Sequence, residues 1–454
     1  GNGAIAMTGN GGGASGGINA GIYVDNGSIQ STSGDIALTG TSATAARIVQ
    51  GVAVVLGAGV STTGGNITLN GTAAAGVDAS VGVNVNQGIL STNGSGNITL
   101  TGTGDNGTSL VGAGIDFGGG SITTINGNIG LTGTDAGNGA TYGISNFAGA
   151  TQTIASSGSG TITLSGAGNT YGIFLRNGTS LNLGNGSGSS SGGSSGSGDI
   201  NFIADTISNA GTFSATTTGS VVFKTLAAGT SIGVNGASGT LGITSSILSG
   251  VNAANTVIGR TDGIGLMRVS GADLTSFTLG NLALLNGSGN IQFDGGGTAL
   301  TLPSNKNLNV ATASGSFTTT AAGTITTSGT GNITIDDPVS LGQNLALNSA
   351  GTVTFGSTVN GGYDLTATAG TFSFGGAIGG TTPLANVSLT STNAMALPAV
   401  TASTVFARTT GATADLTVTG AIAASGSGDA IVLAAQRNMI NNAGASPLVL
   451  TGGG

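Results

Sequence analysis

The feature that most constrains the fold is a seven-residue segment that recurs at a constant spacing. The copies GAIAMTG, GDIALTG, GNITLNG, GNITLTG and GNIGLTG begin at positions 3, 34, 65, 96 and 127, which is a constant 31-residue period. Two looser copies, GTITLSG and GDINFIA, follow at 160–166 and 198–204. A fixed period of this length is typical of repeat proteins, in which each repeat packs only on its neighbours.

Each repeat also carries two short apolar stretches upstream of this segment. The first is a Gly followed by an alternating pair, at residues 21–24, 82–85, 114–117 and 172–175. The second is shorter and is centred on Ile29, Val60, Leu90, Ile122 and Ile154. Alternating apolar residues bounded by Gly, Asn or Ser are typical of strands and turns. The sequence therefore predicts three short strands per repeat.

A constant spacing has a direct physical consequence if one repeat is one coil of a solenoid. Equivalent residues then stack about 4.8 Å apart, which is the distance between neighbouring strands of a sheet. Residues two apart on a strand share a face, so two columns point inward. The first column is Ile5, Ile36, Ile67, Ile98, Ile129 and Ile162, and the second is Met7, Leu38, Leu69, Leu100, Leu131 and Leu164.

Two further columns follow from the same spacing. Between the inward residues lie Ala37, Thr68, Thr99 and Thr163, which we expect to face solvent. Before them lie Asp35, Asn66, Asn97 and Asn128, which we expect at a corner of the coil. Stacked Asn amides can hydrogen-bond from coil to coil, so this column predicts a ladder of side-chain hydrogen bonds along the corner.

Composition agrees with an all-β chain and argues against several functions. The 454 residues include 91 Gly, no His, Cys or Trp, and 8 Lys plus Arg against 16 acidic residues, all of them Asp. Good helix formers are scarce, whereas residues suited to strands and turns abound. The basic residues are scattered, which disfavours nucleic acid as a partner. Without His, Cys or converging acids, we expect no enzyme activity, metal or cofactor.

The repeat pattern divides the chain into three regions. We predict a β-solenoid with 31-residue repeats over 1–204, including a flexible Ser/Gly-rich loop at 184–198, and an irregular or transitional segment over 205–280. Over 281–454 the strand pattern recurs with coils of roughly 20 residues. No membrane span, signal peptide or initiator Met is visible, so we expect the sequence to be part of a longer protein.

A few residues are candidates for chemistry. The adjacent pair Asp336 and Asp337 precedes Pro338, where Asp commonly opens a turn, and we interpret it as a turn. Tyr142, Tyr171 and Tyr363 are expected to be exposed and could contact a sugar or a protein.

Two other protein classes share the solenoid fold. A polysaccharide lyase would need clustered acids with Lys or Arg on one face, and an ice-binding solenoid would need an unbroken Thr array. The chain fits neither pattern well, and no ligand-binding residue can be named.

The run of GNITLTG-like strands, and above all GDAIVLAAQRNMINNAGASPLVL at 428–450, resembles the passenger region of filamentous haemagglutinin-type exoproteins of two-partner secretion systems. The resemblance covers nearly the whole chain and implies a right-handed parallel β-helix, rod-shaped, with three short strands per coil. It also implies export through an outer-membrane secretion partner and display on the surface of a Gram-negative-type bacterium. The NPNG-type motifs of that family's secretion domain are absent.

Two functions from different classes remain open. In the first, the chain is a secreted adhesin stalk or filamentous exoprotein segment that contacts a host cell, a neighbouring cell, a biofilm or glycans. In the second, it is a structural subunit of a self-assembling extracellular fibre or sheath, with end-to-end stacking of copies. The two differ in whether the terminal coils polymerise through their open edges.

Overall fold

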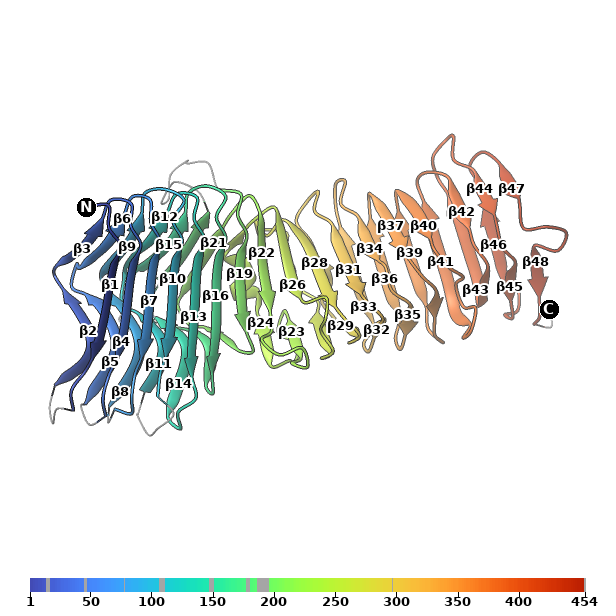
Figure 1. Ribbon diagram of the computed structural model, residues 1–454. Coiled ribbons are helices and arrows are strands. Elements are labelled where there is room, and N and C mark those ends of the chain that lie inside the picture. Colours follow the sequence, from blue (N-terminus) through green and yellow to red (C-terminus); the bar gives the residue numbers. More distant parts are fainter. Residues whose placement is uncertain are drawn as a thin grey trace. The chain divides into compact units, whose positions relative to one another are not determined.

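The computed structural model describes residues 1–13, 17–44, 47–76, 78–105, 111–146, 151–176, 180–185, 196–295 and 297–452. These residues form strands β1 to β48 and a five-residue helix, α1 (Ser245–Ser249). The strands lie side by side in parallel stacks (Figure 1), as expected for a parallel β-solenoid. None of the described helical residues belongs to a helix that is long and apolar enough to cross a membrane.

The chain divides into two compact units. Unit 1 contains Gly1–Ala227 and Ser246–Thr256, and unit 2 contains Ala228–Ser245 and Val257–Gly454. Part of the predicted Ser/Gly loop, residues 186–195, lies outside the described residues.

Each coil of unit 1 contributes one strand to each of three parallel sheets. The first sheet holds β1 (Ile5–Asn10), β4 (Ile36–Thr41), β7 (Ile67–Thr72), β10 (Ile98–Thr103), β13 (Ile129–Asp135), β16 (Ile162–Gly168), β19 (Ile200–Ala204) and β22 (Ser220–Lys224). The second holds β2 (Ile18–Asp25), β5 (Ile48–Val55), β8 (Ala79–Asn86), β11 (Val111–Phe117), β14 (Ala140–Asn146), β17 (Tyr171–Leu175) and β20 (Ile207–Asn209). The third holds β3 (Ser28–Ser31), β6 (Gly59–Thr62), β9 (Gly88–Thr92), β12 (Gly120–Thr124), β15 (Thr151–Ser156), β18 (Ser180–Asn185), β21 (Thr212–Thr216) and β25 (Val251–Asn252).

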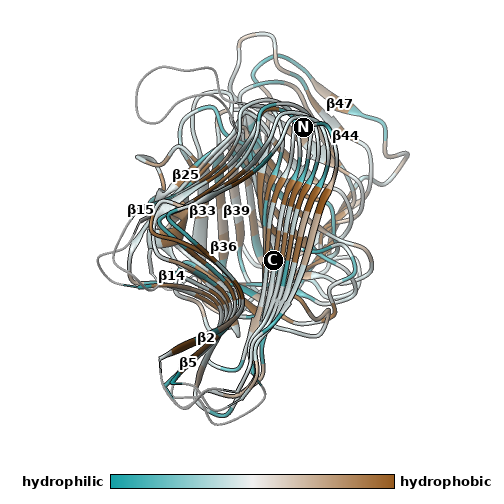
Figure 2. Cartoon of the chain, turned by 60° about the vertical axis from the view of Figure 1, so that its left-hand side comes forward, coloured by the Kyte–Doolittle hydropathy of each residue, from teal (hydrophilic) through white to brown (hydrophobic). Residues whose placement is uncertain are grey.

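The register of the first sheet confirms the predicted columns. Ile36 pairs with Ile67, Ile67 with Ile98, and Ile98 with Ile129, and the Leu column pairs in the same way. From Ile36 and Leu38 onward these residues are buried, and Figure 2 shows hydrophobic residues aligned in bands along the stacked strands. Ile5 is only partly buried, and Met7 is 43% exposed. Both lie on β1, the outermost strand of the sheet, and therefore have a neighbouring strand on one side only.

The corner column also forms hydrogen bonds between coils, as predicted. The side-chain oxygen of Asp35 accepts the main-chain N–H of Asn66 at 2.7 Å, and Asn66 accepts that of Asn97 at 2.9 Å. Asn97 accepts from Asn128 at 2.8 Å, and Asn128 accepts from Thr161 at 2.8 Å. The main chain is a donor at each of these steps, and the amide side chain of Asn66 also donates to Asp35, at 3.1 Å. The ladder therefore satisfies a corner N–H that no strand partner reaches.

Paired glycines explain why the repeated segment ends in Gly. The first two sheets of unit 1 approach each other so closely at this point that a Cβ on Gly40 would collide with the carbonyl of Gly51. The same relation holds between Gly71 and Gly82. Val49 of the second sheet and Ala73, which directly follows β7 of the first, form a separate small cluster of buried residues. Figure 2 shows the second sheet bending where it meets the first.

A column of buried hydroxyl groups lies where the third-sheet strands of successive coils end. The sequence analysis did not predict this column. Thr62 Oγ1 donates to the Gly34 carbonyl at 3.2 Å and accepts the N–H of Gly65 at 3.1 Å. Thr124 Oγ1 donates to Gly96 in the coil before it at 3.0 Å and accepts from Gly127. Other members of the column are Ser31, Thr92, Ser156 and Thr217.

Unit 2 repeats the design with shorter coils. Its first sheet contains β28 (Asn281–Asn286), β31 (Leu308–Thr312), β34 (Ile333–Ile335), β37 (Thr352–Phe355) and β40 (Thr371–Phe374). Leu282 pairs with Leu308, Leu308 with Ile333, Ile333 with Val353 and Val353 with Phe372, so the coils shorten at each step along the unit. The Asn ladder recurs at Asn281, Asn307 and Asn332.

The remaining strands of unit 2 form three further sheets. One holds β23 (Ile232–Val234), β24 (Leu241–Ile243), β27 (Met267–Ser270), β29 (Ile291–Gly295), β32 (Phe317–Thr319), β35 (Val339–Leu341) and β38 (Val359–Asn360). Another holds β30 (Leu300–Thr301), β33 (Gly323–Thr327), β36 (Leu345–Ser349), β39 (Leu365–Ala369), β41 (Leu384–Ser391), β43 (Val400–Thr409), β45 (Ile422–Ala424), β46 (Ile431–Ala434) and β48 (Leu448–Leu450). The smallest holds β42 (Met395–Leu397), β44 (Leu416–Val418) and β47 (Met439–Asn441), and one further strand of the chain is β26 (Asn255–Gly259).

Candidate functional site

The outer face of the second sheet of unit 1 gathers residues that could contact a ligand. Gly114 in β11 has no partner, although Ala113 pairs with Tyr142 and Ile115 with Ile144 on either side of it. This irregularity shifts the alternation of the strand. As a result Ala113 and Asp116, three positions apart, lie on the same outer face.

An outer-face cluster lies here. Its buried members are Val81, Ala113 and Tyr142, and its partly buried members are Val111, Ala140, Tyr171 and Phe174. The Tyr142 and Phe174 rings stack with their centroids 4.6 Å apart, and Tyr171 stacks on Phe174 at 5.6 Å. The expectation that Tyr142 is exposed was therefore wrong, because the residue is 7% exposed and its ring packs against aromatic neighbours from the next coil. Tyr171 is partly buried, whereas Tyr363 is exposed as expected.

Polar side chains lie beside the outer-face cluster. Ser145 Oγ donates to the carboxylate of Asp116 at 2.6 Å. Asn84 occupies the position of Asp116 in the preceding coil. The Asn84 Oδ1 atom and the Gln50 Oε1 atom are buried without a hydrogen-bond partner. Aromatic rings beside amide and carboxylate oxygens can bind a sugar, but here the rings already stack on one another. At β2 the same sheet borders a pocket of about 310 Å³ lined by Ile18, Asn19, Ala20 and Tyr23.

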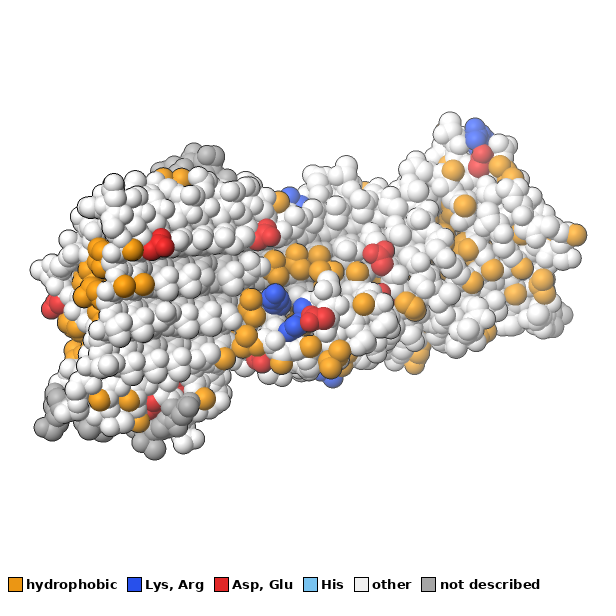
Figure 3. Space-filling view, viewed as in Figure 1, with side chains coloured by type: hydrophobic (Ala, Val, Ile, Leu, Met, Phe, Trp, Pro, Cys, Tyr) orange, Lys and Arg blue, Asp and Glu red, His pale blue; other side chains and the backbone are white. Residues whose placement is uncertain are grey.

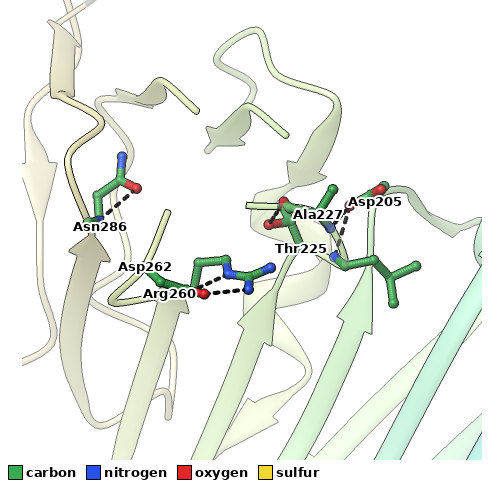
Figure 4. A network of polar contacts seen from close by, with 8 residues as sticks. Asp205, Thr225, Ala227, Arg260, Asp262 and Asn286 are labelled. Carbon is green, nitrogen blue, oxygen red and sulfur yellow. Dashed lines mark hydrogen bonds and ion pairs between the residues drawn. The ribbon is translucent and has the colours of Figure 1, made fainter. Parts of the chain in front are cut away.

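Charged side chains are dispersed over the rest of the surface. The face seen in Figure 3 is mostly uncharged, with Lys, Arg and Asp in small separate groups. Arg47 pairs with Asp78 at 2.6 Å, and Arg437 pairs with Asp415. Arg260 forms a two-pronged pair with Asp262 at 2.6 and 2.8 Å (Figure 4). Such exposed pairs contribute little to stability, and none of them brings acids together for acid–base chemistry.

Two buried carboxylates in consecutive coils of unit 1 are an exception to this dispersal. Asp105 is 4% exposed and Asp135 is 3% exposed. The Oδ1 atom of Asp135 accepts the N–H of Gly137 at 2.9 Å, while its Oδ2 atom has no hydrogen-bond partner. The pKa of Asp135 is raised to about 6, mainly because the carboxyl group is buried; the Gly137 hydrogen bond opposes this rise, and the Asp105 charge adds a smaller contribution to it. Elsewhere in unit 1, Asp205 accepts the N–H groups of Leu226 and Ala227 (Figure 4).

The pair that the sequence singled out, Asp336 and Asp337, joins β34 to β35 and bends the chain there, as a turn requires. Only Asp337 is buried. Its Oδ1 atom accepts the N–H and the hydroxyl of Thr312 at 2.9 and 2.8 Å. Burial raises the pKa of Asp337, and these two hydrogen bonds partly offset that effect. The two carboxylates therefore do not form a shared site.

Sequence reasoning overlooked the pair of Asp105 and Asp135 because the two lie far apart along the chain. Their separation is close to one coil of the solenoid, and positions one coil apart are spatial neighbours. Both residues also follow the same repeated strand, at the end of GNITLTGTGD and GNIGLTGTD. Within the described part of the chain, no three His, Cys, Asp or Glu side chains come together in a group that could hold a metal ion.

Comparisons with family models, curated proteins and solved structures find no match to this chain.

Proposed function

We propose that this chain is a segment of a secreted, filamentous haemagglutinin-type exoprotein that acts as an adhesin stalk in cell attachment or biofilm contact. Export through an outer-membrane partner and display on a Gram-negative-type cell surface are part of the proposal. They are supported by the resemblance of residues 428–450 to that family and by the repeated strands that this family also uses.

The observation that carries the proposal is the repetition of the same weakly polar surface along unit 1. Outward positions of the first sheet recur in every coil, as in Thr39, Asn70, Thr101 and Thr132. A partner that spans several coils can make many equivalent weak contacts with such a column. The overall affinity then exceeds that of any single contact. Dispersed charges and a hydrogen-bonded coil-to-coil register support a structural and adhesive role rather than a catalytic one.

The proposal can be tested with beads that carry the folded chain. We expect chain-coated beads to remain attached to epithelial or bacterial cell layers under flow that removes albumin-coated beads. Heat-unfolded chain on the same beads is the matched control, because it keeps the composition but loses the ordered surface. Retention no better than with albumin would contradict the adhesin proposal.

A fibre subunit is the second candidate, and exposed apolar side chains favour it. The strands β47 and β48 expose Met439, Leu448 and Leu450, and Leu450 is 65% exposed. Open strand edges with apolar side chains are templates for pairing with another chain. Light scattering and negative-stain electron microscopy over a concentration series separate the candidates. Filaments that lengthen with concentration support the fibre, and a constant monomer supports the stalk.

A further inference from the structure

The buried carboxylates Asp105 and Asp135 lie at one point of the solenoid, between two consecutive coils. Thr103 on β10 pairs with Thr134 on β13. Asp105 lies two residues after Thr103, and Asp135 directly follows Thr134. Both side chains are buried. A buried carboxylate needs hydrogen bonds or an opposite charge, and the Oδ2 atom of Asp135 has no hydrogen-bond partner.

Oxygen atoms from both coils converge beside Gly137. A Cβ built on Gly137 would lie 2.9 Å from Asp105 Oδ1 and 3.3 Å from both the Asp105 carbonyl oxygen and Asp135 Oδ1. A Cβ on Gly104 would collide with the Asp135 carboxylate and would lie 3.1 Å from the Ala113 carbonyl oxygen. The site therefore gathers two carboxylates and two main-chain carbonyls.

Three glycines keep this space open. In addition to Gly104 and Gly137, Gly112 lies directly against Asp135 Oδ2, and any side chain at Gly112 would collide with that oxygen. Asp135 Oδ2 is enclosed in this glycine cradle without any hydrogen-bond donor. A buried carboxylate oxygen that lacks a donor is a ligand atom without its partner.

We propose that Asp105 and Asp135 bind a hard divalent cation, Ca²⁺ by preference, which clamps two consecutive coils of unit 1. The carbonyl oxygens of Asp105 and Ala113 complete the protein donors, and water supplies the remaining ligands. Oxygen-only ligands of irregular arrangement suit Ca²⁺, whereas Zn²⁺ takes nitrogen and sulfur ligands, and this chain has no His or Cys.

Calcium titration of the whole metal-free chain at pH 7.5 tests the proposal, with isothermal calorimetry and the melting temperature as readouts. We expect one Ca²⁺ per chain with a dissociation constant on the order of 10⁻⁴ M, as in extracellular calcium modules, and a rise in melting temperature. Asp135→Asn and Asp105→Asn should each weaken binding at least tenfold. Asp35→Asn is the matched control, because Asn occupies the same column position in the next three coils, and it should bind as the wild type does.

Two results would overturn the proposal. The first is a wild-type chain that neither binds Ca²⁺ at millimolar concentration nor gains thermal stability from it. The second is unchanged binding in both Asp135→Asn and Asp105→Asn, which would place the cation elsewhere. Circular dichroism of each variant shows whether lost binding reflects lost folding, and Asp105→Asn remains informative if Asp135→Asn does not fold.

Discussion

The side-chain oxygen of Asn97 accepts the main-chain N–H of Asn128 at 2.8 Å, across one full coil of the solenoid. Asn128 repeats this bond to Thr161, and Asn66 repeats it to Asn97. Each of these hydrogen bonds gives an acceptor to a corner N–H group and joins that corner to the preceding coil. The ladder aligns the corners of successive coils, and it does so in coils of different length, because the same bond spans 33 residues at Asn128 and 26 at Asn281.

Removal of one ladder residue tests this role. Asn97→Ala deprives the Asn128 N–H of its side-chain acceptor, and we expect a loss of about 1 kcal/mol in the free energy of unfolding. Asn97→Asp keeps the acceptor, as Asp35 does for Asn66, and should cost much less. Urea unfolding followed by circular dichroism measures both. Equal losses for the two variants would show that the acceptor is unimportant.

Two glycines in one strand should respond in opposite ways to the same substitution. Gly133→Ala drives a methyl group into the carbonyl of Gly143, whereas Gly130→Ala meets no atom within 4 Å. Since the first forces two sheets apart, we expect it to destabilise the chain by about 2 kcal/mol or more. Gly130→Ala should be neutral or slightly stabilising. Thermal melting of the pair decides the matter, and similar melting temperatures would argue against close contact of the sheets.

The inward Ile column predicts a strong effect of one buried charge. Ile98 is fully buried between Ile67 and Ile129, so Ile98→Asp should cost about 4 kcal/mol or more and unravel the neighbouring coils. Thr99→Asp places the same carboxylate one position later on the exposed face and should change stability little. Unfolding curves of both variants are the measurement. An unchanged curve for Ile98→Asp would be incompatible with the column.

Asp135 makes stability depend on pH in a defined direction. Its folded-state pKa is about 6, above the ordinary 3.8, so the folded chain binds the proton more tightly than the unfolded chain does. In metal-free buffer the free energy of unfolding should therefore fall by about 2 kcal/mol as the pH rises from 4 to 6. Two further acids lie near this group: Asp105 in the preceding coil, and Asp205, which borders a pocket together with Asp135.

The matched variant isolates the contribution of Asp135. Asp135→Asn should flatten the decline between pH 4 and 6, whereas Asp35→Asn should leave it in place. Urea unfolding at several pH values supplies the comparison. If wild type and Asp135→Asn show the same pH slope, protonation of Asp135 is not linked to folding.

The sequence was sufficient to predict the stacked architecture because period and alternation are properties of the chain itself. Ile36, Ile67 and Ile98 identify a column without any knowledge of the third dimension, and Asn66 and Asn97 identify the corner in the same way. Met7 broke the pattern because burial depends on neighbours on both sides, and β1 has only one. A repeat predicts equivalent positions but not equivalent surroundings.

The surroundings of polar groups were much harder to predict. The burial of Tyr142 depends on Phe174, which lies in the next coil and reaches the same face only because the glycine irregularity shifts the strand. Asp105 and Asp135 appear as isolated acids until the coil brings them together. Both features depend on which side chains of neighbouring coils come into contact, and the periodic pattern alone does not specify those contacts.

Cross-linking between coils tests the central claim, the 31-residue parallel register, most directly. The chain has no Cys, so a pair introduced at Thr68 and Thr99, which are register partners on the outward face, has no competing thiol. A short bifunctional thiol reagent should join this pair within one chain. It should not join Cys residues introduced at Thr68 and Thr163, which lie three coils and about 14 Å apart. Efficient linkage of the distant pair, or none of the adjacent pair, would contradict the stacked register.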